Sequence, residues 1–226
     1  MSIGGSLGKA LAPQVQRMAP ELTANFVHEA LSRAIHGVGP LPGAASAADK
    51  QLEEQRGDVD AAIHEVIENH VRYAGAQGFA TNLGGIVTAA VTIPANIAGL
   101  AMLQCRMVAG IAHLRGYDLK DPRVHNAVLA CMLGEDSVRS LVKKKKLPAP
   151  PMAIATAPAH DPHLDKVLAA EVTSELLTKV AGKRVAVTVG RRVPVVGGLF
   201  GAGADGFSTW KIGRYADREL LPRTLR

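Results

Sequence analysis

Residues 73–105 read YAGAQGFATNLGGIVTAAVTIPANIAGLAMLQC, a stretch of 33 residues without one charged side chain. An apolar run of about 18 residues or more is long enough to span a bilayer as one helix. Five glycines, Pro94 near the middle and several amide side chains interrupt this run, however. We therefore interpret it as several helices: one that ends near residues 82–85, a short one over about 83–92, and a third that begins at Pro94.

The segments on either side of this run are also helical in pattern. The third helix is expected to end at Leu114, with Gly116 as its C-cap. Apolar residues recur every three or four positions in the other segments, which is typical of amphipathic helices. We expect such helices over about 22–35, 59–71, 122–133, 164–180 and 194–220, with linkers or loops at 37–48 and 147–162. Three alternating valines at 185–189 would suit a strand, but the sequence offers no partner strand, so helix is preferred.

These patterns predict an all-α fold, a multi-helix bundle with two Gly-rich apolar helical units packed centrally. The second unit follows Val193-Pro194 and contains four glycines. Small residues four positions apart let two helix backbones approach closely. We divide the chain into residues 1–57, an N-terminal helical segment and linker, and residues 58–226, the main helical domain with a basic, Pro-rich loop at about 143–163.

The charge of the chain favours a membrane surface over nucleic acid as its partner. The formal net charge is +6, and residues 1–72 are net acidic, so the basic surplus lies in the last two-thirds. Basic surfaces attract nucleic acid or anionic lipid. Single-stranded nucleic acid also needs aromatic stacking platforms, and only 4% of this chain is aromatic, so we expect no nucleic-acid partner. Two cysteines in apolar surroundings exclude a disulfide scaffold and predict two reduced core thiols.

Two basic clusters are candidates for contact with an anionic membrane. Four consecutive lysines form the first cluster, and the second flanks the uncharged stretch 193–204. Basic groups beside apolar ones are what a membrane surface attracts. A solvated helix end is the alternative for the first cluster. The candidate residues are Lys143, Lys144, Lys145, Lys146, Lys183, Arg184, Arg191 and Arg192.

Polar side chains within and just after the uncharged run are candidate ligand-binding groups. Buried polar groups need partners. They either pair with one another and with the backbone, or line a cavity that holds a lipid headgroup. Arg106 and His113 are seven positions apart, on one helix face, and would recognise a phosphate or carboxylate. The full set is Asn82, Asn96, Gln104, Arg106 and His113.

No motif in the sequence indicates a specific reaction. There is no GxSxG elbow and no phosphate-binding GxxxxGK[ST] loop. His64 and His70 are six positions apart and point in opposed directions on a helix, which favours a solvated face over a metal site. In His160-Asp161-Pro162-His163 we expect Asp161 to cap the helix that follows. The sequence thus predicts no catalytic residue, no metal and no cofactor. An enzyme would have to use Asp118, Asp121, Glu135 or His113.

Several segments together resemble the EcsC family. They are Gly78–Gly85 followed by Thr92–Asn96, Leu103–Val108 continuing into Ile111–Leu119, the Asp121-Pro122 helix start, and Val193–Gly198. The resemblance covers about residues 60–220 and does not include the stretch 143–162. It implies a mostly helical bacterial protein at the cytoplasmic side of the membrane, with no agreed catalytic activity and no catalytic residues to carry over.

The combined expectation is a non-catalytic lipid-binding or peripheral membrane protein. It would be cytoplasmic, peripheral to the inner membrane, and would hold or contact an apolar ligand through its Gly-rich helices. Its partners would be anionic membrane lipid or a bound fatty acid or phospholipid, with a second copy or a membrane-protein partner left open. Three alternatives remain: an integral hairpin over 79–115 that serves a transport system, an enzyme acting on an apolar or lipid substrate, and an interaction scaffold.

Overall fold

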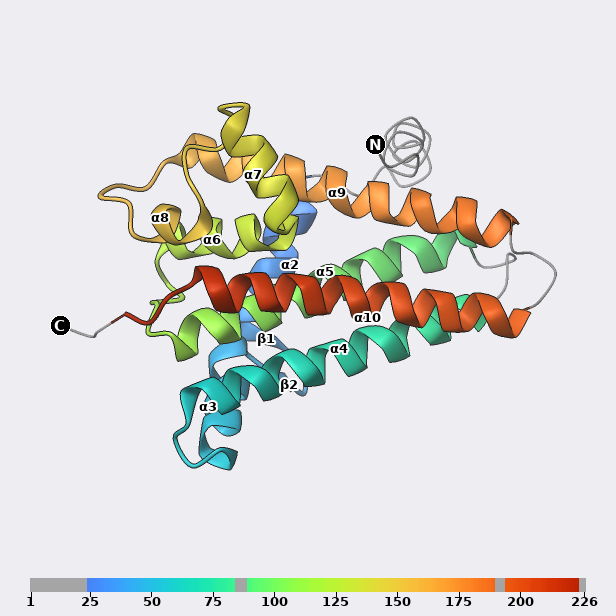
Figure 1. Ribbon diagram of the computed structural model, residues 1–226, viewed down its shortest axis with the longest axis horizontal. Coiled ribbons are helices and arrows are strands. Elements are labelled where there is room, and N and C mark those ends of the chain that lie inside the picture. The colour runs from blue at the N-terminus through green and yellow to red at the C-terminus, as the bar shows by residue number, and fades with distance from the viewer. Residues whose placement is uncertain (1–23, 84–88, 190–193, 224–226) are drawn as a thin grey trace.

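The computed structural model describes residues 24–83, 89–189 and 194–223, without the side chains of residues 24, 78–83, 89–96, 180–189 and 194–202. Nine helices and one short hairpin lie within these residues (Figure 1). The all-α fold class is therefore confirmed. The elements are α2 (Ala24–His36), β1 (Gly37–Val38), β2 (Leu41–Pro42), α3 (Ala44–Glu54), α4 (Val59–Leu83), α5 (Ala89–Leu114), α6 (Pro122–Leu133), α7 (Glu135–Lys143), α8 (Pro151–Ala155), α9 (Pro162–Val189) and α10 (Pro194–Glu219).

Four long helices set the shape of the molecule. Helices α4, α5, α9 and α10 lie along its longest axis, with the C-terminal ends of α4 and α9 beside the N-terminal ends of α5 and α10 at one end (Figure 1). The shorter helices α3, α6, α7 and α8 gather at the other end. Helix α10 packs along α4 and also contacts α5. The sequence predicts two Gly-rich units packed together at the centre, and α5 and α10 do meet there.

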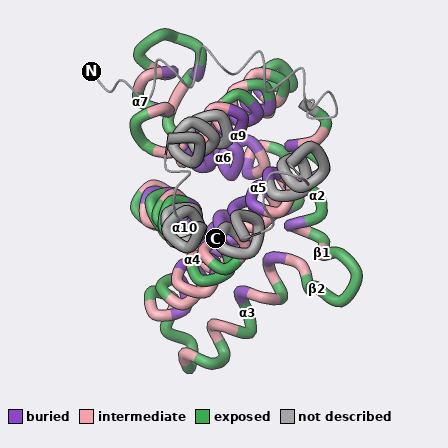
Figure 2. The backbone as a smooth tube through the Cα atoms, turned by 90° about the vertical axis from the view of Figure 1, so that its right-hand side faces the viewer, coloured by how far each residue is buried: buried purple, intermediate pink, exposed green. Residues whose placement is uncertain are grey.

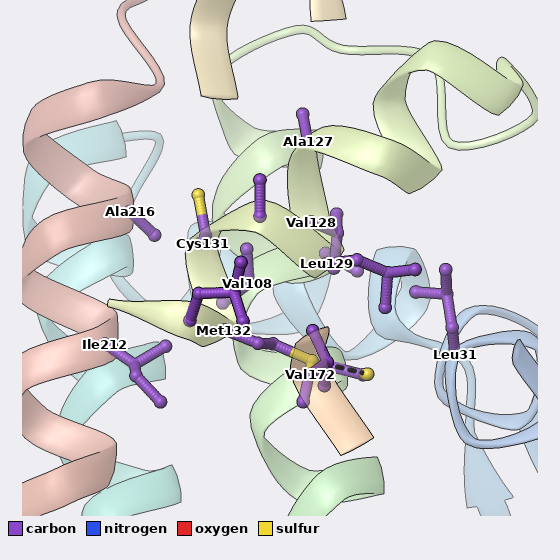
Figure 3. Close-up of a cluster of buried hydrophobic side chains, with 14 of the residues drawn as sticks. Leu31, Val108, Ala127, Val128, Leu129, Cys131, Met132, Val172, Ile212 and Ala216 are labelled. Carbon is purple, nitrogen blue, oxygen red and sulfur yellow. Dashed lines mark hydrogen bonds between the residues drawn. The ribbon is translucent and has the colours of Figure 1, made fainter. Parts of the chain in front are cut away.

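The hydrophobic core surrounds the C-terminal half of α5. Helices α2, α3, α4, α6 and α10 all pack against α5. Figure 3 shows Val108 of α5 among side chains of α6 and α10, with Leu31 of α2 and Val172 of α9 contributing from other sides. Figure 2 shows the buried residues concentrated on the inward faces of these helices. Helices α2 and α3 precede the predicted boundary at residue 57, and their buried residues belong to the same core. Both cysteines are buried and free, as predicted.

Local sequence accounts for several helix ends. Asp58, Asp121 and Asp161 accept hydrogen bonds from the backbone N–H groups of Ala61, Arg123 and His163, at 3.0, 2.8 and 2.9 Å. These bonds satisfy N–H groups that have no partner inside a helix. Gly116, at φ 83°, ends α5 by donating from its N–H to the His113 carbonyl. The predicted caps at Asp121, Asp161 and Gly116 are confirmed, and Asp58 caps α4 in the same way.

Three boundaries differ from the sequence prediction. The expected linker 37–48 contains the start of α3, because the Ala-rich stretch from Ala44 has high helix propensity. Helix α5 begins at Ala89 and continues through Pro94, so the predicted break there is wrong. Pro94 is near the N-terminus of α5 and removes only one intrahelical hydrogen bond. The loop 147–162 contains the short helix α8.

Candidate functional site

A pocket of about 580 Å³ opens between the β1–β2 hairpin, α3, α4 and α5. Its volume falls within the usual range for small-molecule sites, and its walls are mostly apolar. Two cationic side chains, Lys50 and Arg106, line it, and its lining includes no carboxylate. The lining residues are Leu41, Pro42, Ala44, Ser46, Ala47, Ala48, Lys50, Gln51, Val66, Asn69, His70, Tyr73, Met102, Leu103, Arg106 and Gly110.

The close approach of α3 to α5 forms one side of this pocket. A Cβ at Gly110 would lie 3.5 Å from the Cβ of Ala48 and 3.8 Å from the Ala44 carbonyl oxygen. An added Cβ would thus make ordinary van der Waals contacts, which shows that the two helices lie close together at this level. Arg106 lies one turn before Gly110 on the same face of α5. Arg106 therefore lines a pocket whose walls are mostly apolar.

Arg106 is a half-buried cation without an anionic partner among the described residues. No ion pair or hydrogen bond joins its side chain to another residue that the structure describes. Burial lowers the pKa of its guanidinium, and the nearby Tyr73 hydroxyl acts in the opposite direction. Withdrawing a charge from water is unfavourable unless an opposite charge or several hydrogen bonds replace the water. The pocket is therefore suited to receive an anion at Arg106.

His70 keeps the pocket from carrying a further positive charge. It is buried, and its Nδ1–H donates to the Val66 carbonyl at 2.7 Å. Burial lowers the pKa of His70 to about 4, and the neighbouring Arg106 charge contributes in the same direction. His70 is therefore neutral at pH 7, with its Nε2 left as a hydrogen-bond acceptor. Its ring packs edge-on to Tyr73, with centroids 6.4 Å apart, and Tyr73 is largely exposed.

The predicted ligand-binding residues do not form one cluster. Gln104 is about 200° from Arg106 around the helix and donates instead to the Thr209 hydroxyl on α10 at 3.1 Å. His113 is on the Arg106 side of α5, as expected, but its Nε2 contacts the Asp49 carboxylate at 2.6 Å, outside the pocket. The structure thus does not bring these three side chains together. Asn82 and Asn96 lie outside the described side chains.

Along α9, the described members of the second predicted membrane-contact cluster, Lys183 and Arg184, lie about 18–20 Å beyond Glu171, the partner of Lys146. Lys146 pairs with Glu171 of α9 at 2.8 Å, and Lys143, Lys144 and Lys145 are close to it in the chain, at the end of α7. From Glu171 to the end of α9 at Val189 the helix rises by about 27 Å. Lys183 and Arg184 lie in the part of α9 without described side chains, and Arg191 and Arg192 lie outside the described residues.

The sequence analysis did not predict that His70, Tyr73 and helix α3 line the pocket. The histidine spacing predicts a solvated face for His70, yet His70 lies between Val66 and Ala74 at a spacing of four, on the buried stripe of α4. That spacing is the signal that places it inside. Tyr73 follows at the pocket mouth. The sequence predicts a linker over much of α3, so its side of the pocket was not anticipated.

The described residues give little support to two of the alternatives, an integral membrane hairpin and an enzyme. Helix α5 contains the one candidate membrane span among the described residues, Ile97–Leu114, and 61% of that span is buried inside the fold. A core helix passes the same test of length and composition, so this is weak evidence for an integral hairpin. The acids named for an enzyme lie elsewhere. Asp121 caps α6, Asp118 accepts from the Lys120 N–H, and Glu135 pairs with Arg139 and Arg218.

Comparison with known proteins identifies one family. Neither curated proteins nor solved structures give a match to this chain. A family model described as the EcsC protein family matches residues 2–225. The match extends beyond the 60–220 region of the sequence resemblance and includes α2, α3 and the stretch 143–162. It thus includes every described element around the Arg106 pocket. Because it covers nearly the whole chain, the protein belongs to the EcsC family.

Proposed function

We propose that this protein is a non-catalytic lipid-binding protein that associates peripherally with the cytoplasmic face of the inner membrane. It holds a fatty acid or a phospholipid, the anionic head at Arg106 and the chain along the apolar walls of the pocket. The observation that carries this proposal is Arg106 itself, a half-buried cation without an ionic partner among the described residues, in a pocket whose lining has no carboxylate.

The composition of the pocket favours an amphipathic anion over a purely polar one. Leu41, Val66, Met102 and Leu103 give it apolar surface that a small inorganic anion would leave uncovered. Burial of apolar surface contributes about 25 cal/mol per Å² to binding. Neutral His70 adds a hydrogen-bond acceptor but no charge at pH 7. The pocket thus combines one recessed cation with an apolar wall.

The first experiment is native mass spectrometry with lipid extraction on protein purified without detergent. A bound fatty acid or phospholipid at one per chain is expected. Replacement of Arg106 by Met should weaken binding of the identified lipid roughly 10- to 100-fold, which corresponds to one charge-assisted hydrogen-bonded contact. Arg106→Lys should retain more affinity than Arg106→Met because it keeps the charge.

A stability measurement separates loss of the ligand site from loss of the fold. Arg106→Met removes a half-buried charge that has no described ionic partner, so the ligand-free variant should unfold at the same temperature as the parent or higher. Arg72→Met is the matched control, since Arg72 is an exposed arginine on α4 that pairs with Glu68 at 2.7 Å. It should bind lipid like the parent. A protein that carries no lipid and binds none with measurable affinity would refute the proposal.

A further inference from the structure

The outer face of α10 carries an exposed aromatic pair that the pocket does not use. Phe207 and Trp210 are 60% and 46% exposed, and their rings stack with centroids 5.9 Å apart and planes 16° apart. Trp210 is the single tryptophan of the chain. A single exposed apolar side chain is common on protein surfaces and needs no explanation. Two adjacent exposed aromatic side chains form an apolar patch, which points to an interaction site.

Cations accompany this aromatic pair along the same face. Lys211 lies over the Phe207 ring, with its Nζ 5.7 Å from the centroid, and no ion pair joins it to another described residue. Arg214 and Arg218 follow toward the C-terminal end of the same stripe, where they pair with Asp217 and Glu135 at 3.3 and 2.7 Å. All five residues fall within about 100° of the helix circumference. Along the helix, the face thus changes from two aromatic rings, with Lys211 beside them, to two arginines that are paired with carboxylates.

The packing of the opposite face of α10 explains why this stripe is exposed to solvent. Asp205, Thr209, Ile212 and Ala216 are buried against the core, on the side opposite to Phe207 and Trp210. Helix α10 is therefore fixed by its inner face, and the stripe is presented on a rigid element. In sequence, the twelve residues 193–204 that precede the stripe are all uncharged.

We propose that this stripe, Phe207, Trp210 and Lys211, is the surface by which the protein docks on an anionic bilayer. The Trp210 indole has an apolar body and a polar N–H, so it would settle at the level of the lipid headgroups, with the Phe207 ring adding apolar surface and Lys211 reaching the phosphates. The Lys211 charge, which no described carboxylate neutralises, complements an anionic surface, whereas an apolar protein partner would have to bury it. This inference rests on the proposed function and deepens it by naming the membrane-facing side.

The position of Trp210 gives a direct test. Its fluorescence is measured with vesicles of phosphatidylcholine alone and with vesicles that contain an equal part of phosphatidylglycerol. The anionic vesicles should shift its emission to shorter wavelength, and lipids brominated near the headgroup should quench it. Phe207→Ala keeps the reporter and should weaken vesicle binding roughly tenfold, the loss expected for removing one aromatic contact. Val38→Ala, at an exposed apolar residue on the hairpin, is the matched control and should bind like the parent.

Three other outcomes would overturn this assignment. Vesicle binding without a change at Trp210 would place the membrane contact on another surface and would leave the proposed function intact. No vesicle binding, with a lipid still bound at Arg106, would remove the docking surface but not the pocket. A concentration-dependent Trp210 shift without vesicles, together with a discrete oligomer by light scattering, would show that a second copy covers the stripe.

Discussion

The Gln104 side-chain amide donates to the Thr209 hydroxyl across 3.1 Å, in a contact where both residues are completely buried. It joins α5 to α10. The Gln104 Oε1 has no hydrogen-bond partner among the described residues, so the pair is only partly satisfied. A buried polar pair of this kind fixes how two helices sit against each other, and it stabilises the fold less than apolar packing would.

Thr209→Val should destabilise the protein by about 1–3 kcal/mol, because the Gln104 amide nitrogen then loses its partner in the core. The double variant Gln104→Met/Thr209→Val should recover most of this loss, since both polar groups are removed together. Urea unfolding of the parent, the two single variants and the double variant gives the coupling energy. Additive single effects would show that the two side chains do not interact.

At Gly213, helix α10 packs closely against the core. A Cβ added there would lie 3.0 Å from the Cγ atoms of Ile67 and 3.1 Å from the Met107 Sδ. Gly213→Ala should therefore cost about 1–3 kcal/mol of stability by overpacking. At Gly203, on the same helix, an added Cβ would have no described atom within 4 Å. Gly203→Ala should stabilise by about 0.5–1 kcal/mol through helix propensity, and thermal unfolding of both variants tests the contrast.

Arg115 links three helices near one end of the core. Its Nη1 contacts Asp60 of α4 and its Nη2 contacts Asp217 of α10, each at 2.8 Å. Arg115 and Asp217 are largely buried, while the Asp60 side chain is 82% exposed. Arg115→Met should cost about 1–3 kcal/mol, because the Asp217 carboxylate then keeps only Arg214 as an ionic partner, at 3.3 Å.

The exposed Asp60 provides the control for Arg115. Asp60→Asn should cost less than about 1 kcal/mol, because pairs with an exposed partner contribute little. The two variants are compared by urea unfolding at one salt concentration. Equal losses for both would contradict the assignment of the stabilising contact to Asp217.

His70 should make stability depend on pH between about 6.5 and 4. Burial lowers its pKa to about 4 in the folded protein, whereas the unfolded chain titrates near the ordinary histidine pKa of 6.5. Above pH 6.5 both states are neutral at this position and its contribution is constant. As the pH falls through this range the unfolded state binds the proton first, so stability is lost.

The size of this loss follows from the pKa difference. Between pH 7.5 and pH 5.0 it should be about 2 kcal/mol for His70 alone. Because other groups also titrate, the measurement is the difference in pH dependence between the parent and His70→Gln, from urea unfolding at both pH values. A variant with the same pH dependence as the parent would rule out His70 as the cause.

Local signals in the sequence predict most of the helices. Asp121-Pro122 and Asp161-Pro162 each place a carboxylate before a proline that cannot donate, and both start a helix where expected. The error at Pro94 has the same origin, because proline is common at a helix start, whereas here it is the sixth residue of a helix that has already begun. Short-range sequence patterns locate helix ends well. They do not show whether a helix can continue through a proline despite the backbone hydrogen bond that the proline cannot donate.

The pocket is only partly predictable from the sequence. Arg106 stands out by its position in an apolar helix, and it does line the pocket. The polarity of Gln104 and His113 groups them with Arg106 in the sequence, while their partners Thr209 and Asp49 lie 105 and 64 positions away. Contacts between residues so distant in the chain determine which side of a helix packs against which neighbouring helix. A single sequence does not show these contacts.

The pairing of α4 with α10 also has a consequence for how the chain is made. Helix α4 begins at Val59, and α10, which packs along it, begins 135 residues later at Pro194. On the ribosome, the face of α4 that α10 covers stays exposed until α10 has been synthesised. We therefore expect this packing to form late and slowly, as in other topologies with many long-range contacts, and a chain cut short before α10 to be captured by chaperones or degraded.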